Sequence, residues 1–286
     1  MVTTHDRTIA TVLDDMQRRI DAIPPAVAHR RIFAETYFRT TRAVGTAIED
    51  ARFEDPDWVE KWDVVFADLY LQAYDADCAG TADSAESTDT AGTADSADSS
   101  DGADRSDSSD SADSSDSADS ARVPRPWRLA FDAPADLPAL RHVLLGINAH
   151  VNYDLPQALL AVISDDDFTD PVLMARRRRD HERIDAVLAS RVAAEDDKLG
   201  PRTLLDRVLD PLNRLGSKRF LKEARQKVWL NVEQLQLARL DGPERYRRRL
   251  AELEVLSAAK IADLLTPGQV VLRLAVAGFG VVLPPV

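Results

Sequence analysis

The chain has 286 residues, of which 44% are hydrophobic, so it can bury a sizeable core and is not disordered throughout. Its formal charge of −13 comes mainly from residues 79–121, which contain 12 acidic side chains and 1 basic one. The single cysteine, Cys78, excludes an internal disulfide, and the polar first residues contain no secretion signal. We therefore predict a cytoplasmic protein.

Apolar residues recur at helical spacing through residues 1–78. From Thr8 to Ile23 they predict an amphipathic helix that ends at Pro24-Pro25, and a second helix is expected over residues 26–52. Pro56 stands near the start of a third helix, which is rich in Trp and Tyr. Aromatic side chains at this spacing are typical of a buried core.

Residues 79–121 differ from the rest of the chain in composition. They are Ala, Ser, Thr, Gly and Asp, apart from Glu86 and Arg105. Without apolar side chains this stretch cannot offset the entropy lost on ordering, so we expect a disordered surface insertion. Residues 1–78 and 122–286 are then predicted to be two parts of one helical domain.

Prolines mark the chain after the insertion, where Pro124, Pro126 and Pro134 predict an extended connector. Further helices are predicted over residues 172–194, 202–215, 218–240 and 243–265. The apolar end, residues 270–286, is too short for a membrane span and is expected to dock as a terminal helix. With no strand pattern or phosphate loop, the predicted fold class is all-α, a multi-helix bundle.

The segment from Asp136 to Ile163 mixes long apolar runs with polar side chains. Its apolar residues point in nearly every direction of a helix, which predicts a buried helix at the centre of the bundle. A buried polar group without a partner costs about 1–3 kcal/mol, so the polar residues here need partners. They form the candidate site: His142, Asn148, His150, Asn152 and Asp154.

Two His-x-x-x-Asp pairs favour a metal site. His150 and Asp154 lie on one helical face, and His181 and Asp185, beside Asp180, follow on the next predicted helix. Two such pairs can build a four-ligand site in a bundle. We predict a divalent metal ion bound by four residues, with His142 and Asp185 in reserve: His150, Asp154, Asp180 and His181. The function predicted first is a metal-dependent hydrolase or oxygen-dependent enzyme, with four candidate catalytic residues: His150, Asp154, Asn148 and Asn152.

Two other functions stay open. Asp154 followed by Pro156 also fits a helix start, so the segment can instead be two helices with Asp154 as N-cap, in a non-catalytic binding or scaffold domain whose polar network is structural. A third possibility is a nucleic-acid or other anionic partner bound by Arg176–Arg179 and Arg245–Arg249, although such runs are more often solvated faces.

Four stretches carry a resemblance to a known family. They are TYFRTTRAV at residues 36–44, DVVFADLYLQAYD at 63–75, LLGINAHVNYDLPQAL at 144–159 and DHERIDAVL at 180–188. On these the chain resembles a microbial family of unknown function, the domain-of-unknown-function family numbered 5995. The resemblance implies a helical domain on both sides of the acidic insertion, which is not a feature of the family, and it implies no catalytic residue.

Overall fold

The computed structural model describes residues 7–89, 122–196, 217–268 and 278–285. Every regular element within these ranges is helical, which confirms the all-α prediction. The first part contains α1 (Ile9–Ala22), a 3-10 turn (Pro25–Val27), α2 (Arg30–Glu49) and α3 (Pro56–Asp89). The second contains α5 (Arg125–Phe131), α6 (Ala139–Ala149), the π-helical turn η3 (His150–Asp154), α7 (Leu155–Val162), α8 (Asp165–Thr169), α9 (Pro171–Asp196), α11 (Ser217–Leu240) and α12 (Pro243–Leu265).

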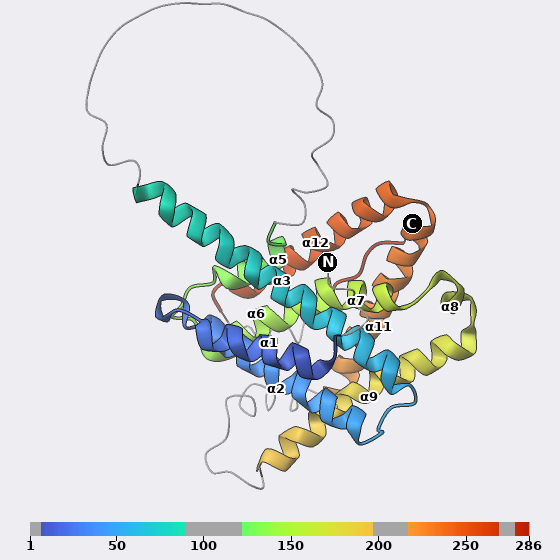
Figure 1. The fold of residues 1–286 in the computed structure, drawn as a ribbon. Helices are drawn as coiled ribbons and strands as arrows, with labels where there is room; N and C mark the ends of the chain where they lie inside the picture. The colour runs from blue at the N-terminus through green and yellow to red at the C-terminus, as the bar shows by residue number, and fades with distance from the viewer. Residues whose placement is uncertain (1–6, 90–121, 197–216, 269–277, 286) are drawn as a thin grey trace, which may run out of the picture.

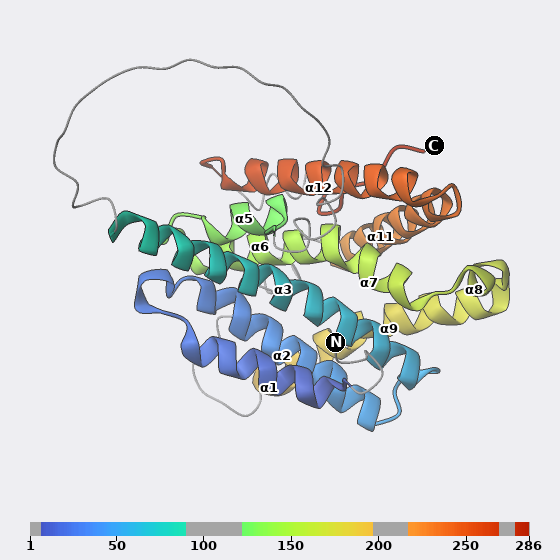
Figure 2. The ribbon, with the colours of Figure 1, turned by 45° about the horizontal axis from the view of Figure 1, so that its top comes forward.

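A central rod made of α6, η3 and α7 runs through the fold. It contacts α2, α3, α5, α11 and α12, and between them these helices cover its sides (Figure 1). Figure 2 shows α1 and α2 in blue at the bottom, α12 in red at the top, and α6 and α7 between them. From His142 to Leu160 only Ile147, Val151 and Gln157 are half-buried, and all other residues are buried. The predicted central buried helix is confirmed.

Local sequence explains where α1 begins and ends. Thr8 caps its N-terminus, because its side chain accepts a hydrogen bond from the backbone of Thr11, whose own side chain bonds back to Thr8. Pro24 and Pro25 follow its last turn and cannot continue an α-helix. Its buried residues lie on one face: Ile9, Val12, Met16 and Ile20.

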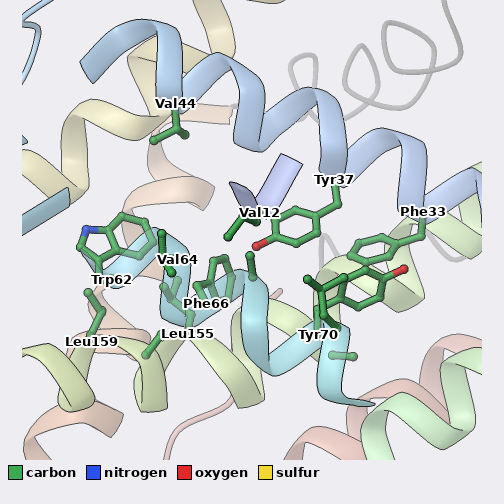
Figure 3. Packing of buried hydrophobic residues seen from close by; sticks show 14 of the residues in the cluster. Val12, Phe33, Tyr37, Val44, Trp62, Val64, Phe66, Tyr70, Leu155 and Leu159 are labelled. Atoms are coloured by element: carbon green, nitrogen blue, oxygen red, sulfur yellow. The ribbon is translucent and has the colours of Figure 1, made fainter. Parts of the chain in front are cut away.

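One apolar core joins the two parts of the chain, since it contains residues from Ile9 to Phe279. Figure 3 shows Phe33 and Tyr37 of α2 pointing toward Phe66 and Tyr70 of α3. Our proposal that residues 1–78 and 122–286 form one domain rests on this shared core. Among the described residues, no helix has the length and apolar content needed to cross a membrane.

Three expected boundaries differ from the structure. Residues 125–131 form α5 instead of an extended connector, because Pro126 falls in the first turn, where no backbone N–H is needed. Helix α2 begins at Arg30, after the 3-10 turn, and not at residue 26. Helix α3 continues to Asp89, past the predicted start of the insertion at residue 79.

Other expectations concern the last part of the chain. Residues 278–285 contain no helix, so the predicted terminal helix is wrong for this segment, although Phe279 and Leu283 are buried and dock it on the core. The predicted helix over residues 202–215 and residues 90–121 of the insertion lie outside the described residues.

Candidate functional site

The central rod changes its winding at η3. Leu155 donates its backbone N–H to the carbonyl of His150, five residues earlier, which is the hydrogen bond of a π-helix. Pro156 comes next and has no N–H, and its ring would clash with a carbonyl four residues earlier in a regular α-helix. The wider turn keeps the rod continuous through Pro156. The alternative of two helices broken near Pro156 is therefore wrong.

His150 and Asp154 face each other within η3. The His150 Nδ1 lies 2.8 Å from Asp154 Oδ2, and the indole Nε1 of Trp127 donates a hydrogen bond of 2.8 Å to the same oxygen. Asp154 makes no side-chain cap on α7. Its carboxyl group is used inside the core, which corrects the interpretation of Asp154 as an N-cap.

Aromatic rings enclose the His150 imidazole. The Phe66 ring stacks on it with centroids 3.5 Å apart, and the Tyr37 ring meets it edge-on at 4.4 Å. Trp127, Tyr70 and Phe33 follow at 5.7, 6.1 and 6.3 Å. The Nε2 atom of His150 is buried and has no hydrogen-bond partner among the described residues.

Burial sets the charge of this pair. It raises the pKa of the Asp154 carboxyl well above its usual value, an effect that the Trp127 hydrogen bond opposes. Burial also lowers the pKa of His150 well below its usual value. Both shifts favour the uncharged form of each group.

The four predicted metal ligands do not come together. Asp180 accepts hydrogen bonds of 2.8 Å from the backbone N–H groups of Glu54 and Asp55, just before α3. His181 lies between the rings of Trp62 and Trp229, each 5.7 Å away, and burial lowers its pKa to about 3. Within the described residues, no three His, Cys, Asp or Glu side chains are grouped to hold a metal ion. The side chain of Asp185 lies outside the described residues.

The asparagines of the rod belong to a different arrangement. Asn148 donates a 2.8 Å hydrogen bond to the Leu144 carbonyl, and its own carbonyl accepts one of 3.2 Å from Asn152. Asn152 also donates to the carbonyl of Phe279 and accepts from the N–H of Val281, both at 3.3 Å. The middle of the rod therefore holds the backbone of the 278–285 segment.

Asn231 on α11 repeats this pattern two residues further along. It donates to the carbonyl of Val281 at 3.0 Å and accepts from the N–H of Leu283 at 2.8 Å. Three cations donate to other carbonyls of the segment: Lys260 to Gly278, Lys227 to Gly280, and Arg249 to Pro284. We call the five side chains the docking surface: Asn152, Lys227, Asn231, Arg249 and Lys260.

Sequence analysis singled out two members of this docking surface, Asn152 as a candidate catalytic residue and Arg249 as part of a cluster for an anionic partner. The structure instead pairs Arg249 with Glu252 and with the carbonyl of Pro284.

Asn231 stands in a helix that contains many other polar and charged residues, so the sequence gives no sign that this one has a distant partner. Lys227 and Lys260 resemble the ordinary charged residues of an amphipathic helix. A weak signal was present, because two glycines, Gly278 and Gly280, punctuate the apolar end of the chain.

The Arg176–Arg179 cluster is neutralised by acidic side chains. Arg177 and Arg176 lie 2.5 and 3.5 Å from Asp55, and Arg179 lies 2.8 Å from Glu54. Arg178 pairs with Glu233 at 2.5 Å. These ion pairs fasten α9 to the start of α3 and to α11, so the cluster gives no support to a nucleic-acid surface.

The fold and this site define an all-helical domain with a buried, mainly apolar rod at its centre that carries a few polar side chains. The sequence model of the family of unknown function numbered 5995 matches residues 9–88 and 110–267. The chain therefore belongs to that family, as the resemblance implied, and the match leaves out residues 89–109 within the acidic insertion. No curated protein and no solved structure matches the chain.

Proposed function

We propose that the chain is a non-catalytic helical binding domain whose docking surface takes an apolar, non-helical peptide segment. In this structure the occupant is the chain's own 278–285 segment. The observation that carries the proposal is the paired bonding by Asn152 and Asn231. Each amide binds the carbonyl of one residue and the N–H of the residue two positions later, as a neighbouring β-strand does.

Main-chain hydrogen bonds of this kind contribute affinity, and a different set of contacts gives specificity. Hydrogen bonds to main-chain groups are available from any peptide sequence, whereas pockets for alternate side chains select the sequence. Phe279 is buried in the main core, and Leu283 packs in a smaller cluster formed with Leu160, Leu235 and Leu253. Between them Val282 is 38% exposed. The occupant expected is a peptide with large apolar residues spaced as Phe279 and Leu283 are.

Glycine is favoured at two positions of such a peptide. Gly278 has a φ of +72°, which strains any residue with a side chain. A Cβ at Gly280 would lie 2.8 Å from Cδ and 3.2 Å from Cβ of Lys227, closer than normal contacts. The docking surface therefore fits the pattern Gly-Phe-Gly-Val-Val-Leu of residues 278–283.

His150 supports a second candidate function, acid–base chemistry. The carboxyl group of Asp154 holds the imidazole through Nδ1 and leaves Nε2 without a partner, so that nitrogen is available for proton transfer. The π-helical turn also favours this reading, since such turns occur frequently at functional sites. We rank it second because stacked aromatic rings enclose the imidazole.

Peptide binding in trans tests the first proposal. A chain that ends at residue 277 is mixed with a fluorescent peptide of residues 278–286, and fluorescence anisotropy is recorded together with the melting temperature. We expect saturable binding and a melting temperature that rises with peptide concentration, because a ligand of the folded state stabilises it by mass action. If both signals were absent at peptide concentrations up to the solubility limit, the proposal would be contradicted.

The matched control is the same peptide methylated on the backbone nitrogens of Val281 and Leu283. It keeps every side chain but loses the two donors that Asn152 and Asn231 accept from. Each lost hydrogen bond leaves a buried acceptor unpaired, so binding should weaken at least about tenfold. Equal affinity of the two peptides would show that apolar contacts alone hold the segment.

A further inference from the structure

Two histidines from distant parts of the sequence meet beside α5. His29 lies just before α2 and His142 lies on α6, and their ring centroids are 5.0 Å apart with an angle of 37° between the rings. The Nδ1 atom of His29 and the Nε2 atom of His142 are both buried, and neither has a hydrogen-bond partner among the described residues. The His142 residue itself is 5% exposed.

Backbone carbonyls support both rings from the other side. The second nitrogen of His29, Nε2, lies 3.3 Å from the carbonyl oxygen of Phe131. Burial and the neighbouring His29 lower the pKa of His142, while a hydrogen bond with the backbone of Ala135 opposes this shift. Histidines that bind metals commonly use their second nitrogen in this way, which fixes the orientation of the ring.

We propose that His29 and His142 form a two-histidine site for a late first-row transition metal ion, with Ni²⁺, Cu²⁺ and Zn²⁺ as the chemical class. Neutral imidazole suits these ions. Metal–nitrogen bonds are about 2.0–2.1 Å long. If the nitrogen–metal–nitrogen angle lies between the square-planar and the tetrahedral value, the centroids of two coordinated rings are about 4.5–5.5 Å apart. The observed separation of 5.0 Å falls in this range. Water completes the coordination.

Nearby charges are compatible with a cation. The Arg30 guanidinium also contacts the Phe131 carbonyl, but it is ion-paired with Asp77. The Asp136 carboxylate favours positive charge at His142, since it raises the pKa of that imidazole. The site is separate from the docking surface and does not depend on the proposed binding of peptides.

Metal titration of the whole chain, purified without a chelating tag and stripped of metal, tests the site. We expect one equivalent of Ni²⁺ or Zn²⁺ per chain by calorimetry, and a Cu²⁺ paramagnetic resonance spectrum with two nitrogen ligands. Cu²⁺ should bind more tightly than Ni²⁺, in the usual order of divalent ions. His29→Gln and His142→Gln should each weaken binding at least about tenfold, because each removes a ligand.

His181→Gln is the matched control, because it removes another buried histidine that lies between two tryptophan rings. It should keep the affinity of the unaltered chain within about twofold. If His142→Gln does not fold, His29→Gln decides the question, since His29 is only half-buried. Absence of metal uptake by the unaltered chain, or unchanged affinity in the His29→Gln variant, would overturn the proposal.

Discussion

The side-chain carbonyl of Asn152 accepts a hydrogen bond of 3.3 Å from the backbone N–H of Val281, 129 residues further along the chain. The same amide donates to the carbonyl of Phe279. These two bonds join the centre of the buried rod to the last described residues. The 278–285 segment thereby covers polar groups that the rod and α11 would otherwise leave without partners.

Asn231→Ala tests how much this contact stabilises the fold. Asn231 is 1% exposed, and its removal leaves the carbonyl of Val281 and the N–H of Leu283 without their partner. We expect a loss of about 1–3 kcal/mol in the free energy of unfolding, measured with urea. Leu230→Ala is the control, because Leu230 is the preceding residue and is 47% exposed. A loss no larger than that of the control would contradict the account.

His150→Leu separates a structural role from a chemical one. The leucine keeps most of the volume but removes the hydrogen bond to Asp154, so a structural role predicts a loss of about 1–3 kcal/mol. His181→Leu should change stability less or increase it, because Nδ1 of His181 is buried without a partner in the described part of the chain. If the His150→Leu variant were instead more stable than the unaltered chain, His150 would lower the stability of the fold. A chemical role for His150 would then be the better explanation.

Gly146→Ala tests the close contact between α6 and α2. A Cβ at Gly146 would overlap the ring carbons of Phe33, which is itself buried. Overpacking of this kind costs about 1–3 kcal/mol, and a second substitution, Phe33→Leu, should recover part of the loss. At Gly80 in α3 the same Cβ meets no atom within 4 Å, so Gly80→Ala should be neutral or stabilising. Equal melting temperatures for the two alanine variants would show that the helices separate freely here.

Residue patterns predicted the helices well where one face is apolar and the ends carry clear signals. The helix over residues 243–265 was placed correctly, because Gly242 and Pro243 mark its start. Local patterns failed where the role of a side chain depends on partners that are far away in the sequence. Asp180 looked like a metal ligand beside His181, yet its carboxylate pairs with backbone N–H groups before α3. Asn231 could not be recognised, because its partner follows 50 residues later in an irregular segment.

Asp63 makes the stability of the fold depend on pH. Burial, and secondarily Glu60, raises the pKa of this carboxyl from an ordinary 3.8 to about 7. Because the folded pKa is the higher one, the contribution of Asp63 to stability is greatest below pH 3.8 and is lost as the pH rises toward 7. The slope is on the order of 1 kcal/mol per pH unit.

Asp63→Asn removes this titration. Compared with the unaltered chain, the variant should gain relative stability between pH 5 and pH 7, and its advantage should level off above pH 7. Urea unfolding at pH 5, 6, 7 and 8 measures the difference, in which the other titrating groups cancel. Parallel pH profiles for the two proteins would mean that Asp63 ionises normally.

The most direct test of the docking surface compares the whole chain with the chain that ends at residue 277. If the 278–285 segment occupies the surface, it competes with added peptide at an effective concentration in the millimolar range. We therefore predict that the labelled peptide of residues 278–286 binds the whole chain at least about 100-fold more weakly than the shortened chain. Equal affinities for the two chains, or binding to neither, would contradict the claim that this surface is a peptide-binding site.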